Sequence, residues 1–407
     1  MPKATYIVHL IEALGSGGAE RLLYTNLKRF DRSRFHHEVI TVFSNATHWK
    51  EPIRELGVEV TSLDCQSLRD LPKGVRRLRR LMQNNRPDLI HTHLWAANVI
   101  GRVAGRLSRI PVVSSIHNPD HEPDAWDDGA AVNPMKRRLA QSMDRWTAGF
   151  GCDRLVAVSE YVRRSAHQRL GLPLDRIDLL YNPIDVDQFH PTSSGKRQGA
   201  IQTLGELGLP EGSVILLNVA RVSPQKGLLY AIRALPAVME KYPEAHLVSV
   251  GATVDQYWLS HLKAEASSLG VADHAHFLGT RRDIPDLLRG CDLFVFPSLY
   301  EGLGISLIEA MATGRPCIAS QAGPIPEVIR HGVDGRLVPP ADAQALADEI
   351  CSLLANEEER KRLGEAAAAS VLERFHPETA ARKLESIYES VLGRSRSVIK
   401  GAAAARP

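Results

Sequence analysis

The feature that most constrains the fold of this chain is the alternation of short apolar runs with longer stretches of helical periodicity, such as 19–30. Strands that alternate with helices predict βα units and a parallel sheet in each half of the chain. In the first half, apolar runs predict strands at residues 5–10, 36–44, 58–63, 88–93, 112–117, 154–159 and 177–182. In the second half, they predict strands at 214–220, 246–251, 275–280, 292–298 and 316–320.

The length of 407 residues exceeds what one hydrophobic core supports, about 250–300 residues. We therefore predict an α/β protein with two doubly wound, Rossmann-like domains and a cleft between them. In such sheets, ligands bind at the carboxyl ends of the strands, near helix N-termini. The predicted parts are a first domain at 1–190, a small and polar linker at 191–202, a second domain at 203–375, and a segment at 376–407. We expect that last segment to form a helix that packs back on the first domain, followed by a flexible tail.

Composition excludes several classes of protein. No run of about 18 apolar residues exists, so we predict no membrane span. The N-terminus lacks a convincing cleavage site, and we interpret it as a strand and a loop rather than a signal peptide. The five cysteines are scattered and include no CxxC pair, which favours the reducing cytoplasm. A net charge of +3 is too small to indicate a nucleic-acid partner.

The stretch SLYEGLGISLIEAMATGRPCIAS (298–320) joins a predicted strand to a predicted helix and carries two carboxylates, Glu301 and Glu309. Gly302 and Gly304 between them allow a ligand to approach the backbone closely. Eight residues of helix would rise about 12 Å, more than the carboxylate spacing of a glycosidase. Two carboxylates that far apart are suited to binding the hydroxyls of two parts of one ligand. The alternative is that Glu301 is a solvated loop residue and Glu309 a helix-surface charge.

The start of the second domain offers a phosphate site. Arg221 and Lys226 follow the strand predicted at 214–220, and a helix begins near Gly227. A guanidinium fork, an ammonium and a helix N-terminus all favour an anion. The alternative is that both cations are only solvated.

Taken together, these stretches resemble glycosyltransferase family 4, whose members have two Rossmann-like domains in the GT-B arrangement and retain the anomeric configuration. The resemblance extends along almost the whole chain. It also includes GSGGAE (15–20), HTHLW (91–95), SIHN (115–118), YNPID (181–185), AGPIPEVI (322–329) and HGVDGRLVPP (331–340). Each motif is weak by itself, but the ordered set is specific.

The resemblance implies roles in binding a nucleotide-sugar donor, a UDP- or GDP-sugar. Arg221 and Lys226 would hold the diphosphate, and Glu309 would accept the ribose hydroxyls. Glu301 and the backbone of Gly302, Leu303 and Gly304 would hold the transferred sugar and the phosphate. Leu303 departs from the family pattern because an aromatic residue is common there. The stretch 250–256 also departs, because it lacks a second glycine.

The first domain would supply the acceptor side. The resemblance places His117 near the reacting sugar, and Gly17 and Gly18 near the phosphate or the acceptor. His93, Trp95 and Trp126 are candidate contacts of the acceptor. Trp126 lies in an acidic stretch, 118–134, that is either a lid or a disordered insertion.

We predict no metal and no cofactor, because two cations and a helix terminus can neutralise the leaving diphosphate. Asp185 and Asp187 spell a DxD motif, but they follow a strand and we discount them. His91 and His93 share one strand face, yet the sequence shows no third ligand beside them. We therefore interpret these histidines as structural or as substrate contacts.

Residues 69–86 carry seven basic side chains and one acidic one. Leu71, Val75, Leu78 and Met82 form one helical stripe that would pack on the sheet. The basic face is either solvated or contacts an anionic membrane.

The function predicted from these observations is that of a cytoplasmic hexosyltransferase, with a peripheral position on the inner face of the cell membrane left open. Its acceptor would be a glycan or a lipid-linked glycan in bacterial surface polysaccharide or glycolipid assembly. The alternatives are a nucleotide-sugar 2-epimerase of the same plan and a non-catalytic nucleotide-sugar-binding protein.

Overall fold

The structure, a computed structural model, describes residues 4–15, 17–119, 122, 134–191, 202–210, 212–253 and 255–404. The side chains of 134 and 394–404 are not described. Most of the predicted linker, residues 192–201, lies outside the described residues. The described chain forms two compact units: the first combines the residues up to Pro183 with those from Pro377 onward, and the second runs from Ile184 to His376.

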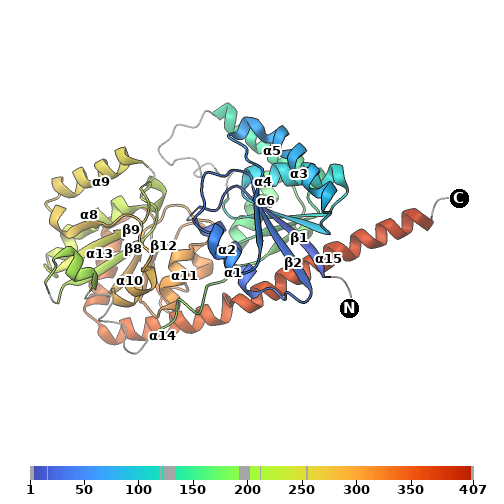
Figure 1. Ribbon diagram of the computed structural model, residues 1–407. Coiled ribbons are helices and arrows are strands. Elements are labelled where there is room, and N and C mark those ends of the chain that lie inside the picture. Colours follow the sequence, from blue (N-terminus) through green and yellow to red (C-terminus); the bar gives the residue numbers. More distant parts are fainter. Residues whose placement is uncertain are drawn as a thin grey trace. The chain divides into compact units, whose positions relative to one another are not determined.

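The first unit contains a parallel sheet of seven strands in the order β3-β2-β1-β4-β5-β6-β7 (Figure 1). Its strands are β1 (Thr5–Ile11), β2 (Phe35–Thr41), β3 (Glu59–Ser62), β4 (Leu89–His93), β5 (Val112–Ile116), β6 (Arg154–Ala157) and β7 (Ile177–Leu179). Its helices before the C-terminal segment are α1 (Gly18–Arg29), α2 (Lys50–Glu55), η1 (Leu68–Asp70), α3 (Leu71–Asn84), α4 (Trp95–Ser108), α5 (Pro134–Gly151), α6 (Glu160–Leu170) and η3 (Leu174–Arg176).

Alternation along the central strands builds a core on both faces of this sheet. On β1, Ile7 and Ile11 are buried with residues of α1, whereas Val8 and Leu10 are buried with Leu78 of α3. Leu78 and Met82 of α3 are fully buried, and Leu71 and Val75 pack partly against the same core. Successive side chains of a strand point to opposite faces of the sheet, so a strand covered on both faces buries alternate residues in two different cores.

The C-terminal helix α15 (Pro377–Ala404) belongs to the first unit and packs against α1. Leu384 and Tyr388 are buried in the same core as Ile7 and Leu23. Glu385 accepts a hydrogen bond of 2.8 Å from the backbone amide of Asp31 and lies 3.3 Å from Arg34. Apolar burial and a charged contact therefore both hold this helix on the first sheet.

The second unit contains a parallel sheet of six strands in the order β10-β9-β8-β11-β12-β13. Its strands are β8 (Val214–Val219), β9 (Ala245–Val250), β10 (Ala275–Phe277), β11 (Leu293–Phe296), β12 (Cys317–Ser320) and β13 (Arg336–Val338). Its helices include η4 (Pro224–Lys226), α8 (Leu228–Met239), α9 (Gln256–Ser268), η5 (Ala272–His274), α10 (Ile284–Gly290), α11 (Ile305–Ala312), α12 (Ile325–Val328), α13 (Ala343–Leu354) and α14 (Glu357–Arg374).

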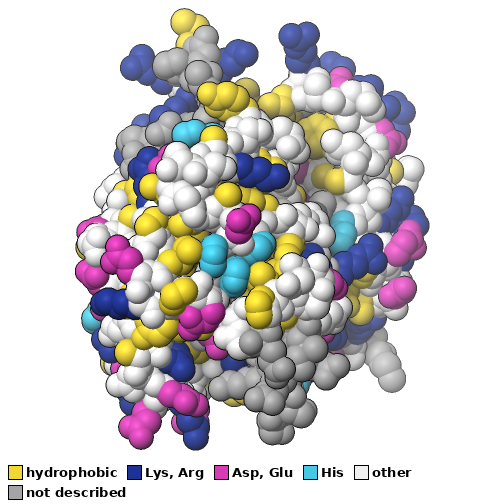
Figure 2. Space-filling view, turned by 90° about the vertical axis from the view of Figure 1, so that its left-hand side faces the viewer, with side chains coloured by type: hydrophobic (Ala, Val, Ile, Leu, Met, Phe, Trp, Pro, Cys, Tyr) yellow, Lys and Arg dark blue, Asp and Glu magenta, His cyan; other side chains and the backbone are white. Residues whose placement is uncertain are grey.

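Side-chain caps begin several of these helices where the sequence supplies Asp or Asn. Asp255 accepts from the amide of Tyr257, Asp342 from Ala345, and Asn356 from Glu359. Figure 2 looks onto the side where α8, α9 and α13 lie, and shows histidine side chains gathered at the surface there. In this unit His246 on β9 lies 3.1 Å from His276 on β10 and stacks on His274.

The predicted fold class, α/β with two parallel-sheet domains, is confirmed. The edge strand β13 was not predicted, because its three residues carry little periodicity. No helix of the described residues is long and apolar enough to cross a membrane.

Candidate active site

The chemistry-bearing residues of the second unit lie at the carboxyl ends of two neighbouring strands, β8 and β11. Leu216 pairs with Leu293 between these strands, so the loops that follow them start side by side. The amide of Leu299 donates to the carbonyl of Gln225 at 2.8 Å, and the side chain of Gln225 donates to the carbonyl of Tyr300 at 2.9 Å. These bonds join the two loops into one surface.

Lys226 and Glu301 form an ion pair on that surface. The ammonium Nζ lies 2.8 Å from Glu301 Oε1, and the side chains are only 13% and 9% exposed. Lys226 ends the short helix η4, and Glu301 lies in the loop before α11. A buried pair of this kind holds an ammonium and a carboxylate at one point, where a ligand with both phosphate and hydroxyl groups finds a partner for each.

Gly227, directly after Lys226, is required by its surroundings. Its φ is +63°, and a Cβ would lie 1.9 Å from the carbonyl oxygen of Pro297. The first loop thus packs directly on the backbone that follows β11. A side chain at this position would therefore force apart the loops that follow β8 and β11.

The loop before α11 places the second carboxylate. Gly304 is the N-cap of α11 with φ +93°, a conformation that favours glycine. Leu303 is buried, and Glu309 inside the helix is only 1% exposed. Exposure of only 7% at Glu301 and 1% at Glu309 contradicts the alternative in which both are solvated surface charges. Buried carboxylates are retained where a partner binds them.

Arg221 and two hydroxyl groups complete this edge of the second sheet. Arg221 lies two residues after the end of β8 and is exposed. The hydroxyls of Ser223 and Ser298 are buried and have no hydrogen-bond partner. Buried polar atoms are normally satisfied, so two unsatisfied hydroxyls in adjoining loops indicate a polar ligand. Sequence reasoning missed both serines; their position between the motif residues, in RVSPQKG and FPSLYEG, was the available signal.

The first unit presents its predicted residues at the carboxyl edge of its own sheet. His93 ends β4, Trp95 begins α4, and His117 follows β5. His93 Nδ1 faces His117 Nε2 at 3.4 Å, and His117 Nδ1 is buried without a partner. Burial lowers the pKa of His117 to about 4, which keeps its imidazole neutral at pH 7.

The turn between β4 and α4 is strained at Leu94. This residue has φ +73°, which is uncommon for a side chain with a Cβ. Strain of this kind concentrates where geometry serves a function. The indole nitrogen of Trp95 is buried without a partner, and Trp95 lines a small pocket with Asn98, Ile116, Asn118, Asp144 and Arg169. This pocket lies where β4 and β5 end, beside the start of α4.

Gly17 and Gly18 lie at the N-terminus of α1, in the connection that follows β1, and are exposed. Trp126 lies outside the described residues. Asp185 and Asp187 belong to a turn in which the Asp185 carboxylate accepts from the amide of Asp187 at 3.2 Å.

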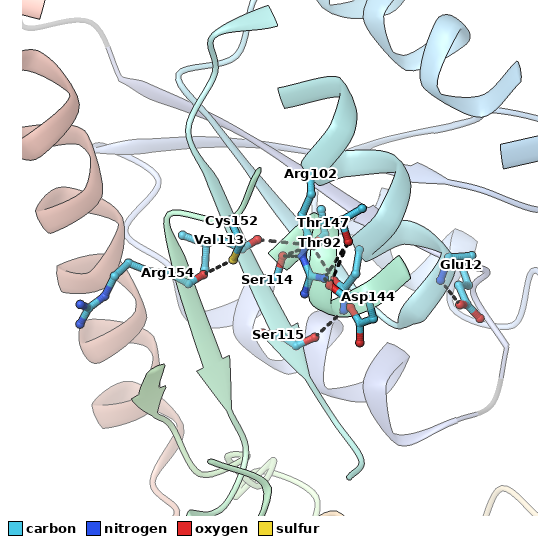
Figure 3. A network of polar contacts seen from close by, with 12 residues as sticks. Glu12, Thr92, Arg102, Val113, Ser114, Ser115, Asp144, Thr147, Cys152 and Arg154 are labelled. Atoms are coloured by element: carbon cyan, nitrogen blue, oxygen red, sulfur yellow. Dashed lines mark hydrogen bonds and ion pairs between the residues drawn. The ribbon is translucent and has the colours of Figure 1, made fainter. Parts of the chain in front are cut away.

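A buried polar network, drawn in Figure 3, adjoins the pocket through Asp144. Arg102 on α4 is fully buried and pairs with Asp144 on α5. Its Nε also donates to Ser114 on β5 at 3.0 Å, and the hydroxyl of Ser114 bonds Thr92 on β4 at 2.8 Å. The network therefore ties α4 and α5 to the strands that carry His93 and His117.

The structure shows a feature of these histidines that the sequence does not. His91 and His93 do have a third potential ligand beside them: among the described residues, His9, His91 and His93 form a group whose ligand atoms lie within 4.8 Å of one another. His9 lies on β1, which pairs with β4. The sequence could not show this, because strand adjacency is not encoded in local periodicity. Burial lowers the pKa of each of the three well below its ordinary value.

Comparison with known proteins agrees with this geometry. The family model described as Glycosyltransferase Family 4 matches residues 16–188, and the model described as Glycosyl transferases group 1 matches residues 202–370. The crystal structure of Anabaena HepE in complex with UDP and glucose has a TM-score of 0.82, with 24% identity over 95% of this chain and 100% of that chain. Sucrose-phosphate synthase from Thermosynechococcus elongatus has a TM-score of 0.76, with 19% identity over 96% and 100%. The two parallel α/β units thus define a GT-B glycosyltransferase.

Two relatives of known name cover most of this chain. The Escherichia coli UDP-Gal:alpha-D-GlcNAc-diphosphoundecaprenol alpha-1,3-galactosyltransferase is 27% identical over 296 residues, 71% of each chain. The Bacillus anthracis N-acetyl-alpha-D-glucosaminyl L-malate synthase is 28% identical over 319 residues, 78% of each chain. With both family models matched, the chain belongs to glycosyltransferase family 4.

Proposed function

We propose that this protein is a metal-independent hexosyltransferase that moves a sugar from a UDP-sugar to a hydroxyl acceptor with retention of the anomeric configuration. The observation that carries the proposal is the Lys226–Glu301 pair at the joined ends of β8 and β11. Arg221 and the two unsatisfied serine hydroxyls adjoin it. Uracil is favoured over guanine because HepE binds UDP and the named E. coli relative uses UDP-Gal.

In the proposed reaction, negative charge develops on the leaving diphosphate as the sugar–oxygen bond breaks. Arg221 and Lys226 stabilise that charge, and they are already placed before the donor binds, which lowers the barrier. Glu309 accepts the ribose hydroxyls, and Glu301 with the backbone of 302–304 orients the transferred sugar. Glu301 has one carboxylate oxygen engaged by Lys226, which suits orientation of a sugar better than general-base catalysis. Retention is proposed because the chain resembles glycosyltransferase family 4, whose members retain the anomeric configuration.

We propose a lipid-linked glycan as the acceptor, in assembly of a surface polysaccharide or glycolipid. The E. coli relative is named for a diphosphoundecaprenol-linked acceptor. Trp95 and the pocket beside it would contact the acceptor sugar, and the neutral His117 would contact the reacting sugar, whereas His93 is only 2% exposed and would act through its contact with His117. Aromatic and imidazole rings pack on sugar faces and bind their hydroxyls.

An exposed apolar and basic surface on the first unit supports this acceptor. Helix α5 exposes an apolar stripe of Met135, Leu139, Trp146 and Phe150, which lie within about 60° of one another at 100° per residue. Lys136, Arg138 and Arg145 flank the stripe and are exposed. Exposed aromatic residues bordered by cations are typical of a helix that lies in the membrane interface.

Helix α3 adds further basic residues to the layer of helices that contains α5, because α3 packs on α4 and α4 packs on α5. Lys73, Arg76 and Arg80 are exposed, whereas Arg77 is bound to the carbonyls of Leu63 and Asp64. The predicted contact through 69–86 is therefore better assigned to α3 and α5 together. We propose that this surface brings the protein to anionic lipid.

The test is product analysis with a panel of nucleotide sugars, each incubated with and without lipid-linked and soluble sugar acceptors. We expect a new glycosidic bond that requires an acceptor, and proton NMR of the linkage should show the anomeric configuration of the donor. Epimerised sugar nucleotide formed from donor alone would replace the proposal with an epimerase. An inverted linkage would remove the retaining mechanism.

A further inference from the structure

The first unit collects histidines on the face of its sheet that α1 and α15 cover. Four histidines lie on this face at every second position of their strands, in the same layer as apolar residues such as Ile7 and Val39. They are His37 on β2, His9 on β1, and His91 and His93 on β4. His9 and His91 are register partners across β1 and β4. All four histidines are at least 95% buried. So many imidazoles in one apolar layer are costly unless their nitrogens are bound.

We propose that His9, His91 and His93 form a binding site for a divalent transition metal of the Zn²⁺ type. One ring nitrogen from each lies within 4.8 Å of the others. His9 Nδ1 and His93 Nε2 face each other at 3.4 Å. Two Zn–N bonds of about 2.0–2.1 Å at a tetrahedral angle place their nitrogens about 3.3–3.4 Å apart. The separation of these two nitrogens is thus already that of two ligands of one ion.

The ring nitrogens that point away from the proposed ion are also occupied. His9 Nε2 lies 3.0 Å from His37 Nδ1, and His93 Nδ1 faces His117 Nε2 at 3.4 Å. His91 has a hydroxyl at each nitrogen, Tyr388 at 2.7 Å and Ser115 at 2.8 Å. The nitrogen that binds the ion would exchange its hydroxyl for the metal, and the other would keep its partner. Metal-binding histidines almost always have such a partner on the second nitrogen, because it fixes the tautomer and the ring orientation.

The donor set selects the metal. Three imidazole nitrogens suit Zn²⁺, Co²⁺, Ni²⁺ or Cu²⁺, whereas Mg²⁺ and Ca²⁺ require oxygen ligands. This site therefore differs in chemistry from a Mg²⁺ or Mn²⁺ site on a diphosphate, and it lies in the first unit, whereas Lys226 and Glu301 lie in the second.

Metal binding would have a consequence for His117. An ion on Nε2 of His93 leaves the proton of that ring on Nδ1, which then donates to Nε2 of His117. The proton of His117 is thereby placed on Nδ1, the nitrogen that is buried without a partner in the protein. The site would fix His117 as a hydrogen-bond donor at the edge of the first sheet.

The test uses the full chain without a polyhistidine tag, purified from zinc-supplemented cells. We expect about one zinc ion per chain by mass spectrometry of the metal, and visible absorption bands of tetrahedral Co²⁺ after exchange. X-ray absorption of the zinc-loaded protein should show imidazole scattering at about 2.0–2.1 Å. Zinc added to metal-free protein should raise the melting temperature by mass action.

His9→Gln and His93→Gln, checked for folding by circular dichroism, should each lose the bound metal and the rise in melting temperature. The matched control is His246→Gln, which alters the histidine trio of the second unit and should retain wild-type metal content. The proposal would be overturned if metal-free wild-type protein, after addition of Co²⁺, shows no absorption bands of tetrahedral Co²⁺. Equal metal content in folded His9→Gln protein, or zinc without imidazole scattering, would overturn it as well. The wild-type spectroscopy decides the question even if neither variant folds.

Discussion

Lys226 donates a 2.8 Å hydrogen bond to Glu301, although 75 residues separate the two along the chain. One residue follows β8 and the other follows β11, and the contact exists because these strands are neighbours in the second sheet. The pair joins the residue assigned to the diphosphate with the residue assigned to the transferred sugar. Under the proposed function, a donor molecule that carries both groups would find both partners at one point of the second unit.

Replacing Lys226 by Ala should lower turnover by about 10²-fold or more, because the leaving diphosphate loses a preplaced cation. Steady-state rates with the identified donor measure this effect. The control is Arg233→Ala, which removes an exposed cation of α8 that pairs with Glu265, and should leave turnover unchanged. Turnover of Lys226→Ala near that of the control would mean that this lysine does not bind the leaving group.

Activity should not depend on Mg²⁺ or Mn²⁺. Arg221 and Lys226 already supply positive charge at the end of β8, and we assign no carboxylate pair to a metal on the diphosphate. Initial rates measured within minutes of adding EDTA should stay within about twofold of the untreated rate. The short exposure leaves a buried transition metal in place. Activity that is lost with EDTA and restored by Mg²⁺ would direct attention back to Asp185 and Asp187.

The exposed stripe of α5 should govern binding to lipid. Trp146→Ser with Phe150→Ser should reduce co-sedimentation with vesicles that contain anionic lipid by about tenfold, because two aromatic side chains no longer enter the interface. Replacing Arg76 and Arg80 of α3 by Gln should weaken binding and its salt dependence. Tyr257→Ser, which removes an aromatic residue of α9 that is 80% exposed, is the matched control. Equal sedimentation of all variants would leave α3 and α5 as solvated helices.

The second unit should lose stability in acid through His246. Burial, followed by the charges of His274 and His276, lowers its pKa to about 4, and the backbone near Asp273 only partly opposes this shift. The unfolded chain, with an ordinary pKa near 6.5, binds the proton first as pH falls. The free energy of unfolding should therefore decrease between pH 6.5 and 4 and be unaffected by this group above pH 6.5.

His246→Gln should flatten this part of the pH profile. Urea unfolding measures the free energy of unfolding of His246→Gln and of wild type at each pH. The difference between these two free energies should change by an amount on the order of 1–3 kcal/mol between pH 7 and pH 4. His48→Gln, at an exposed position of the first unit, should leave the profile as in the wild type. An unchanged profile in His246→Gln would show that this histidine titrates alike in the folded and unfolded chain.

The sequence was sufficient for the two-sheet fold, because apolar runs and helical stretches alternate so regularly. It also located Lys226 and Glu301, since strand ends and glycine-containing loops can be recognised locally. It could not predict that His9 lies beside His91, because β1 and β4 are far apart in the chain and their adjacency follows from the crossover order of the sheet. The burial of Glu309 could not be predicted either. Helical periodicity indicates which side of a helix a residue lies on, but the tertiary packing of this short helix decides whether that side is exposed.

The most direct test of the central claim is calorimetric titration with nucleoside diphosphates, because it requires no acceptor. Wild-type protein is titrated with UDP, GDP and ADP and with the corresponding nucleosides, and the same series is repeated with Lys226→Ala. We predict that UDP binds at least tenfold more tightly than uridine, and that Lys226→Ala removes most of this difference. Equal binding of UDP and uridine, or an undiminished preference for UDP in Lys226→Ala, would contradict the account.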